Sequence, residues 1–306
     1  MSAVISSLNE RQLEARKTFI GGSSAAAALG MSPWQTPLEL WLEMTGRKER
    51  PDISGKGAVK WGIYLEDPVA QEFSRVTGLK IRRDSTSFVH PEHEFMGGHI
   101  DRRIVGRREG LEVKTAGFFA GQEWGEEGTD SVPLHYLIQA VHYMAVTGWD
   151  GWHFAVLIGG QDFRTYFVPR DEELIARVIE GERQFWSYIV EDIPPDYTSG
   201  ADVLLRFPTD DGSAIGAEEE HLAAYHELTG IKAEVKKLEK RGDELTDFLK
   251  MRLENHTELL GPDNRPLAVW KASTSRRFDS KAFSKEHPEL FEKYSTETTT
   301  RRFNLK

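Results

Sequence analysis

The segment from residue 99 to residue 114 limits what this chain can fold into more than any other. Two short apolar runs flank Gly106 and Arg107, and a two-residue turn there would join them into an antiparallel hairpin. That register pairs Asp101 with Glu112. Opposed residues of a hairpin share a face, with Cβ atoms roughly 5 Å apart. The sequence therefore predicts two carboxylates converging on one patch of sheet.

Lys114 follows Glu112 by two residues and therefore points to the same face. Two carboxylates this close repel, and the pair stays ionised best with a divalent cation between them. All-oxygen ligands favour Mg²⁺ or Mn²⁺. A lysine beside such a metal can orient or deprotonate a water while the metal stabilises charge on a scissile phosphate. Charged residues on a solvent-exposed hairpin are also common, so the pattern alone leaves a purely structural hairpin open.

Cysteine is absent from the 306 residues, which excludes a disulfide, a thiolate zinc site, an iron–sulfur cluster and a cysteine nucleophile. This composition fits a reducing cytoplasm. No apolar run approaches the roughly 18 residues of a membrane span. The N-terminus lacks a signal-peptide pattern. We therefore expect no membrane association.

The net charge of −10 is unevenly distributed. Residues 262–306 hold 10 lysines and arginines and 6 acidic residues, a net charge of +4, and the remainder carries −14. An enzyme that gathers metal-binding carboxylates can be acidic overall and still bind DNA through a local groove. The overall charge therefore excludes no nucleic-acid partner.

Residues 1–195 are predicted to form an α+β core, with a mixed sheet and helices that pack on it. Thr36 and Glu39 form a capping-box pattern, and Asp171 is a further N-cap. Trp34 and Trp61 are expected in the core. We expect helices near residues 1–20, 25–29, 37–46, 63–77, 134–147 and 171–191, and strands near 79–83, 86–89, 100–116, 152–158 and 163–168.

The chain changes character after residue 195. Residues 196–217 are predicted to be a linker and 218–306 a C-terminal extension. Within it, 218–258 has near-heptad spacing, for which we favour a long helix or helical hairpin over a dimeric zipper. Residues 262–306 are predicted to be a small α/β segment with one helix over 280–293. Its aromatic residues alternate with arginines, which suits nucleic-acid contact or the core and rim of a small domain.

Several short motifs in the region 14–195 occur in a characteristic order, and on them the chain resembles the YqaJ-type viral recombinases. These are lambda-exonuclease-like members of the PD-(D/E)xK nuclease superfamily. The resemblance implies a PD-(D/E)xK nuclease core, a mixed central sheet flanked by helices. The "Pro-Asp" of the superfamily name is Ile100-Asp101 here. The motifs are Gly21-Gly22-Ser23, Ser32-Pro33-Trp34, Trp61-Gly62 with Glu66, His99-Ile100-Asp101, Leu111-Glu112-Val113-Lys114 and Tyr136-Leu137-Ile138-Gln139.

The resemblance also implies roles at the matching positions. Asp101 and Glu112 would hold metal ions together with the backbone carbonyl of Val113. Lys114 would position or activate the attacking water. Glu66 would be a further metal or water ligand.

Further roles concern the helix near 134–147 and the N-terminal region. Tyr136 and Gln139, one helical turn apart, would approach the metal site and the scissile phosphate. Arg16 and Ser23 would grip a DNA 5′-phosphate, because a helix N-terminus and a guanidinium both suit an anion. His99 would contact phosphate near the metal or be structural.

The implied activity is digestion of duplex DNA from its 5′ ends with two Mg²⁺ ions, for which Mn²⁺ would substitute. It would leave 3′ single-stranded tails for recombination by strand annealing. The implied partners are a single-strand annealing protein and, as in relatives, further copies in a trimeric ring. A phage or prophage origin and a bacterial cytoplasm are expected. Two alternatives stay open: another PD-(D/E)xK endonuclease or structure-specific nuclease, and a catalytically silent DNA-binding or scaffold protein.

Overall fold

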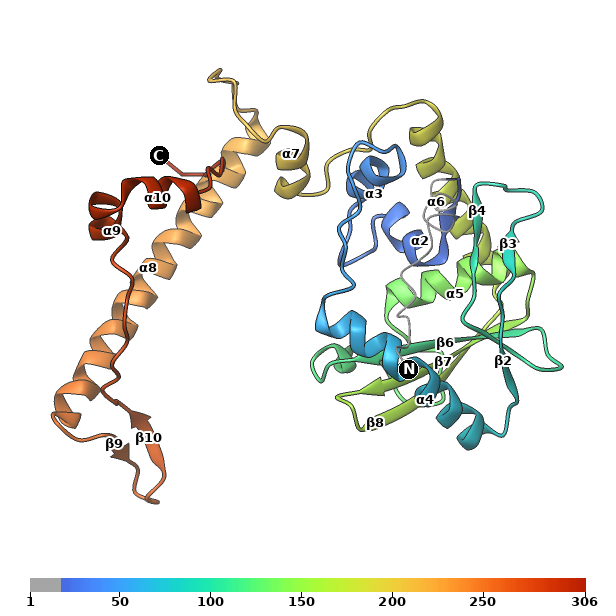
Figure 1. Ribbon diagram of the computed structural model, residues 1–306, viewed down its shortest axis with the longest axis horizontal. Coiled ribbons are helices and arrows are strands. Elements are labelled where there is room, and N and C mark those ends of the chain that lie inside the picture. The colour runs from blue at the N-terminus through green and yellow to red at the C-terminus, as the bar shows by residue number, and fades with distance from the viewer. Residues whose placement is uncertain (1–17) are drawn as a thin grey trace. The chain divides into compact units, whose positions relative to one another are not determined.

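The computed structural model describes residues 18–306, and the chain divides into a first unit that ends at Arg206 and a second that begins at Phe207 (Figure 1). This boundary lies inside the segment predicted to be a linker. Arg16 and most of the helix expected over residues 1–20 lie outside the described residues. No helix among the residues described is both long and apolar enough to cross a membrane.

A five-stranded mixed sheet forms the centre of the first unit. Only β6 and β7 run parallel, and the other neighbouring pairs are antiparallel. The prediction of a mixed sheet flanked by helices is therefore confirmed. In spatial order the strands are β2 (Ile81–Arg83), β5 (Arg102–Ile104), β6 (Glu109–Ala116), β7 (Gly151–Ile158) and β8 (Asp162–Pro169).

The β5–β6 hairpin has the predicted register. Arg102 pairs with Leu111 and Arg103 with Gly110, and the turn passes through Gly106 at φ 80°. One more step along this register places Asp101, which directly precedes β5, opposite Glu112. The local turn chemistry thus set the alignment of the two carboxylates.

The two faces of the sheet are covered by different helices (Figure 1). Helix α4 (Gly57–Thr77) packs its Val69 and Phe73 against Leu111. Helices α5 (Leu134–Thr147), α2 (Gly22–Ala28) and α6 (Glu172–Val190) belong to the opposite layer. Because strand side chains alternate, Leu111 faces α4, whereas Glu112 and Lys114 face α5.

A small second sheet joins the N-terminal segment to the approach to Asp101. Strand β1 (Ile20–Gly21) runs parallel to β4 (Met96–His99), which pairs on its other side with β3 (Ser87–Val89). The start of α2 therefore lies beside the strand that leads into Asp101. Gly22 is required here, because a Cβ at this position would lie 2.5 Å from the Tyr143 ring.

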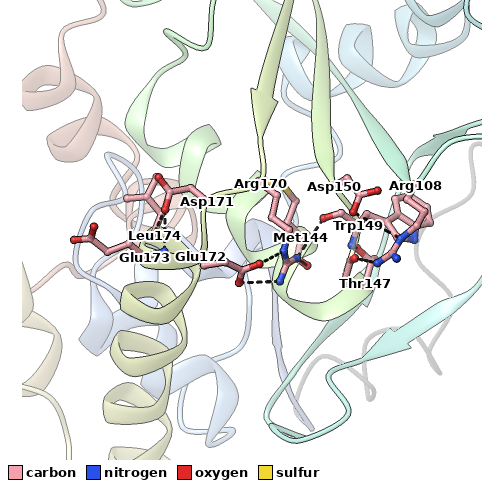
Figure 2. A network of polar contacts seen from close by, with 11 residues as sticks. Arg108, Met144, Thr147, Trp149, Asp150, Arg170, Asp171, Glu172, Glu173 and Leu174 are labelled. Atoms are coloured by element: carbon pink, nitrogen blue, oxygen red, sulfur yellow. Dashed lines mark hydrogen bonds and ion pairs between the residues drawn. The ribbon is translucent and has the colours of Figure 1, made fainter.

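Capping interactions fix the ends of three helices. The Thr36 capping box opens α3 (Pro37–Met44), and Asp171 caps α6, both as predicted. Arg170 donates hydrogen bonds to the carbonyl oxygens of Met144 and Trp149, at 2.6 and 3.2 Å, and also pairs with Glu172 (Figure 2). This arginine thus ties the C-terminal end of α5 to the N-terminal end of α6.

Two expectations about the tryptophans are wrong. Trp34 is 69% exposed and Trp61 is 61% exposed, so neither is a core residue. Helix α4 begins at residue 57 rather than near 63, which puts Trp61 within the helix. Only the stripe of α4 that contains Val69 and Phe73 meets the sheet, and Trp61 is outside it.

Helix α7 (Gly200–Arg206) shows that the first unit reaches into the predicted linker. Its Asp202 is buried and accepts a hydrogen bond from the Thr36 hydroxyl at 2.5 Å. The same carboxylate accepts from Thr198, so it holds α7 against the start of α3.

The second unit is built around one long helix, α8 (Glu219–Leu253), rather than a helical hairpin. A hairpin of β9 (Glu258–Leu260) and β10 (Pro266–Val269) follows. The helix expected over 280–293 is divided into α9 (Ser280–Glu286) and α10 (Pro288–Tyr294). Pro288 explains the break, since proline cannot continue the hydrogen-bonding pattern of a helix.

Candidate active site

Helix α5 and strand β6 bring four of the predicted site residues together. Glu112 and Lys114 project from β6 towards α5, which presents Tyr136 and Gln139 one turn apart. Lys114 Nζ lies 2.7 Å from Glu112 Oε1 and 3.1 Å from Gln139 Oε1. Gln139 Nε2 donates to the same Glu112 oxygen at 2.9 Å. The three polar side chains therefore form a closed triangle of hydrogen bonds.

Asp101 adds a second carboxylate to this triangle. Its Oδ2 lies 3.5 Å from the backbone nitrogen of Val113, at the edge of hydrogen-bonding distance. Burial and, after it, the charge of Glu112 together raise the pKa of Asp101 to about 7. Without a cation, Asp101 is therefore protonated in a substantial fraction of the molecules at neutral pH.

One oxygen of Glu112 indicates that the site suits a metal ion. Glu112 is 5% exposed, and its Oε2 is buried with no hydrogen-bond partner among the described residues. A buried carboxylate oxygen without a partner is unfavourable. A divalent cation between Glu112 and Asp101 would satisfy this oxygen and stabilise the ionised form of the aspartate. The carbonyl of Val113 as a further ligand stays a prediction.

Lys114 is held as an ammonium group. Burial alone would lower its pKa, but the neighbouring Glu112 carboxylate offsets this and raises it. The Nζ also lies 4.6 Å from the centre of the Tyr136 ring, a cation–π contact. Burial raises the pKa of Tyr136, which keeps the phenol protonated. Lys114 is therefore suited to orient water and to neutralise charge rather than to remove a proton.

Glu66 occupies a different environment from the other two acidic residues. It is on α4, and its Oε1 accepts a hydrogen bond from Arg102 at 2.8 Å. Its charge contributes to the raised pKa of Asp101, which places it in the same electrostatic neighbourhood. Glu66 Oε1 is thus already paired with Arg102. A direct contact between Glu66 and a metal ion stays a prediction.

Over residues 18–306, one group of three acidic or histidine side chains has ligand atoms all within 4.8 Å of one another. It consists of Glu218, Glu220 and His221, which are exposed at the start of α8. Glu66, Asp101 and Glu112 form no such compact group. Exposed carboxylates at a helix start are common, and this group lacks the burial seen at Glu112.

Arg102 was not identified from the sequence, although it shapes the site. It is 3% exposed, and it forms ion pairs with Glu66 and Asp67 of α4. The hairpin register could have identified it, because that register pairs Arg102 with Leu111 on the face of the sheet that α4 covers. A buried arginine on that face needs a carboxylate partner, and α4 offers two adjacent ones.

Ser23 and His99 emerge at the same end of the small sheet. Gly21 pairs with Gly97, and each predicted residue follows its glycine by two positions. Both side chains are exposed, and Asp101 is only two residues beyond His99. Their roles in binding phosphate stay predictions, as does that of Arg16.

The fold and the site define a class of protein: a mixed-sheet α+β unit with a buried and a half-buried carboxylate and a lysine on one hairpin. Residues 12–150 match the family described as YqaJ-like viral recombinase domain. Uncharacterized protein YqaJ of Bacillus subtilis (strain 168) is 34% identical over 299 residues, covering 95% of this chain and 92% of that protein. The chain therefore belongs to the YqaJ family, as the sequence motifs predicted.

Solved structures with a similar course of the chain include two bacterial exonucleases. The alkaline exonuclease LHK-Exo of Laribacter hongkongensis is 17% identical, with a TM-score of 0.49, and the match covers 60% of this chain and 94% of that one. A phage related exonuclease from Haemophilus somnus 129PT is 15% identical, with a TM-score of 0.43, covering 57% and 96%. The family assignment rests on the sequence relative and not on these two structures.

Proposed function

We propose that this chain is a metal-dependent deoxyribonuclease that digests duplex DNA from 5′ ends and leaves 3′ single-stranded tails. The observation that carries the proposal is the convergence of Asp101, Glu112 and Lys114 with a buried, unpartnered oxygen on Glu112. Membership of the YqaJ family supports the same activity.

The residues of the site have separable tasks in this reaction. Asp101 and Glu112 would hold Mg²⁺ or Mn²⁺, two ions in all, which supply positive charge at the scissile phosphate and at the attacking water. Lys114 orients the water and balances charge that develops on the phosphate. Gln139 holds both neighbours in place: its amide oxygen accepts a hydrogen bond from Lys114, and its amide nitrogen donates one to Glu112.

The proposed polarity depends on recognition of the DNA end. Ser23 offers an exposed hydroxyl in the first turn of α2, and His99 is exposed at the end of β4, the strand that pairs with β1. Together with Arg16, these groups would bind a 5′-phosphate and leave the next phosphodiester bond near Asp101. We further propose that a single-strand annealing protein takes up the tail, that copies of the chain assemble into a ring, and that the protein acts in the cytoplasm of a bacterium that carries a phage or prophage.

The test is a time course with linear duplex DNA labelled at either the 5′ or the 3′ end, in Mg²⁺ or in EDTA. The proposal expects rapid release of the 5′ label as mononucleotide, persistence of the 3′ label, and no reaction in EDTA. Arg16→Ala should reduce the preference for 5′-phosphorylated over 5′-hydroxyl ends.

Circular duplex DNA separates the proposal from its alternatives. An exonuclease cannot start on a closed circle, so cleavage of circles at the rate of linear DNA would indicate an endonuclease. Asp101→Asn, Glu112→Gln and Lys114→Ala should each reduce the rate by 10³-fold or more, since about 1.4 kcal/mol of barrier is tenfold in rate. Full activity of Glu112→Gln with Mg²⁺ would contradict the assignment of the site.

A further inference from the structure

The second unit contains a short repeat that the proposed function does not use. Residues 273–281 and 298–306 each consist of three hydroxyl-bearing residues, then Arg-Arg-Phe, then Asp or Asn, with Lys at the end. Residues 271–279 and 295–306 form neither helix nor strand, so almost the whole of both copies lacks regular secondary structure. The copies flank the α9–α10 pair in the sequence.

Positive charge in this unit is concentrated in and beside the two copies. No acidic residue occurs between Asp263 and Asp279 or after Glu297, and these stretches contain seven lysines and arginines. The intervening residues 279–297 contain three lysines and five acidic residues. The cations of the repeat therefore have few carboxylates near them in the chain.

Three of the four repeat arginines are free to bind a ligand. Arg276, Arg277 and Arg302 make no ion pair or hydrogen bond within the part of the chain that the structure describes. Arg301 donates a hydrogen bond to the carbonyl oxygen of Phe207 at 3.0 Å. An arginine fork without a partner is suited to phosphate, because its planar donors match two phosphate oxygens.

The aromatic residue of each copy is exposed to solvent. Phe278 is 72% exposed and Phe303 is 79% exposed. An exposed phenylalanine beside arginines contributes little to a core, but its ring offers a face on which a nucleic-acid base can stack. The hydroxyl groups of residues 273–275 and 298–300 add hydrogen-bond donors for the phosphate backbone.

We propose that the two Arg-Arg-Phe segments bind single-stranded DNA, with the arginines on phosphates and the phenylalanine rings on unpaired bases. A duplex is a poorer fit, because its bases are stacked on one another and offer no free face to Phe278 or Phe303. Both segments belong to the second unit and share no residue with the proposed nuclease site, so the proposal is independent of the proposed nuclease activity. The match with the Bacillus subtilis relative covers 95% of this chain and therefore includes most of this unit.

The test measures binding of the full-length protein to a fluorescent 30-nucleotide oligo-dT in EDTA, by anisotropy over a range of salt concentrations. The variant Arg276→Gln/Arg277→Gln/Arg302→Gln should bind at least tenfold more weakly at low salt. Its slope of log K against log salt should be lower by about 2, since each phosphate contact on a single strand contributes roughly 0.7.

A second variant separates stacking from charge. Phe278→Ala/Phe303→Ala should weaken binding of oligo-dT by roughly 10-fold or more, because the substituted positions can no longer stack a ring on a base, and should leave the salt slope unchanged. Phe278 contacts the ring of Phe283, with centroids 5.0 Å apart, so Phe278→Leu/Phe303→Leu serves as a companion that keeps apolar bulk. Affinity for a blunt duplex should not change in either phenylalanine variant.

A matched control removes the same charge elsewhere in the unit. Lys232→Gln/Lys236→Gln/Lys237→Gln changes three exposed lysines of α8 and should alter the affinity less than twofold. If this control and the arginine variant lose the same affinity for oligo-dT, net charge alone would explain the loss, and the proposal would be overturned. Unchanged oligo-dT binding in both phenylalanine variants would also overturn it and would leave the repeat to a protein partner.

Discussion

At the scale of single residues, the two oxygens of Glu112 have different surroundings. Oε1 accepts hydrogen bonds from Lys114 and Gln139, whereas Oε2 is buried without a partner among the residues described. The lysine thus compensates only part of the charge that Glu112 and Asp101 bring to the site. A cation that binds the folded chain at this oxygen would also stabilise the folded chain.

Mg²⁺ should therefore raise the melting temperature of the wild type. At about 100 times its dissociation constant, a ligand of the folded state adds roughly 2.7 kcal/mol, which is several degrees for a unit of this size. Glu112→Gln should lose this response. The control Glu180→Gln, an exposed acidic position on α6, should keep it. A full Mg²⁺ response in Glu112→Gln would show that the ion binds elsewhere.

A second buried pair predicts a pH dependence of stability. His142 Nε2 lies 3.0 Å from the carbonyl oxygen of Gly97 and must donate to it, and Nδ1 lies 2.7 Å from Glu182 Oε1. Burial alone would lower the pKa of His142, but Glu182 offsets this and raises it. A raised folded-state pKa gives a stabilisation that is complete below about pH 6.5, the unfolded value, and is lost as the pH rises through the folded value.

The free energy of unfolding of the wild type should consequently fall as the pH rises above about 6.5, by up to about 1.4 kcal/mol per pH unit, and the melting temperature should fall with it. In Glu182→Gln the amide can donate to Nδ1 of a neutral imidazole while Nε2 still donates to Gly97. That variant should be less stable than the wild type at pH 6 and much less sensitive to pH above it. Parallel pH profiles of the two proteins would contradict this assignment.

The residues that could be predicted are those whose neighbours are close in sequence. Asp101, Glu112 and Lys114 belong to one hairpin, so the turn at Gly106 was sufficient to align them. The pairs of Arg102 with Glu66 and of His142 with Glu182 join elements 36 and 40 residues apart. Their partners depend on how helices dock on the sheet, which no local pattern records.

At the scale of elements, helix boundaries were predictable where a capping residue marks them. The capping box of Thr36 and the N-cap Asp171 are correct, whereas α4 has no capping side chain and starts six residues earlier than expected. The wrong expectation about Trp61 has the same origin. Because α4 begins at residue 57, Trp61 belongs to the helix and lies on a face that no strand covers. Amphipathic spacing identifies the buried stripe but not the length of a helix.

The close approach of α2 to α5 can be tested with one glycine. Gly22→Ala would place a Cβ 2.5 Å from the Tyr143 ring, and such overpacking should cost about 1–3 kcal/mol of stability. Gly57→Ala is the matched control, because nothing lies within 4 Å of a Cβ there. In a Tyr143→Ala background the cost of Gly22→Ala should shrink. An equal cost in both backgrounds would contradict the contact.

At the scale of the whole molecule, composition indicated two parts and the structure divides the chain within the predicted linker. The sequence also predicted a long helix or helical hairpin from the heptad spacing of 218–258, and the structure has one long helix there. Apolar residues of this helix are exposed: Leu238 is 67% exposed and Phe248 is 65% exposed. Heptad spacing predicts that apolar residues line up along one side of a helix. Whether that side is buried depends on what packs against it.

Limited proteolysis should cut first in residues 207–217. Every residue there is exposed and none is in a helix or strand, and Ile215 is 98% exposed. Exposed chain without regular structure is the preferred substrate of proteases. Mass spectrometry should therefore find an early pair of fragments that meet in this segment. Early cuts within β6 or α5 would contradict the division into two units.

Lys114 also determines how the negative charges of the site are compensated before a metal ion binds. Its ammonium group already offsets one of the two acids, and a proton can occupy the other at neutral pH. A cation that binds Glu112 and Asp101, as proposed, would therefore have to displace this proton and share Glu112 with the Lys114 ammonium group.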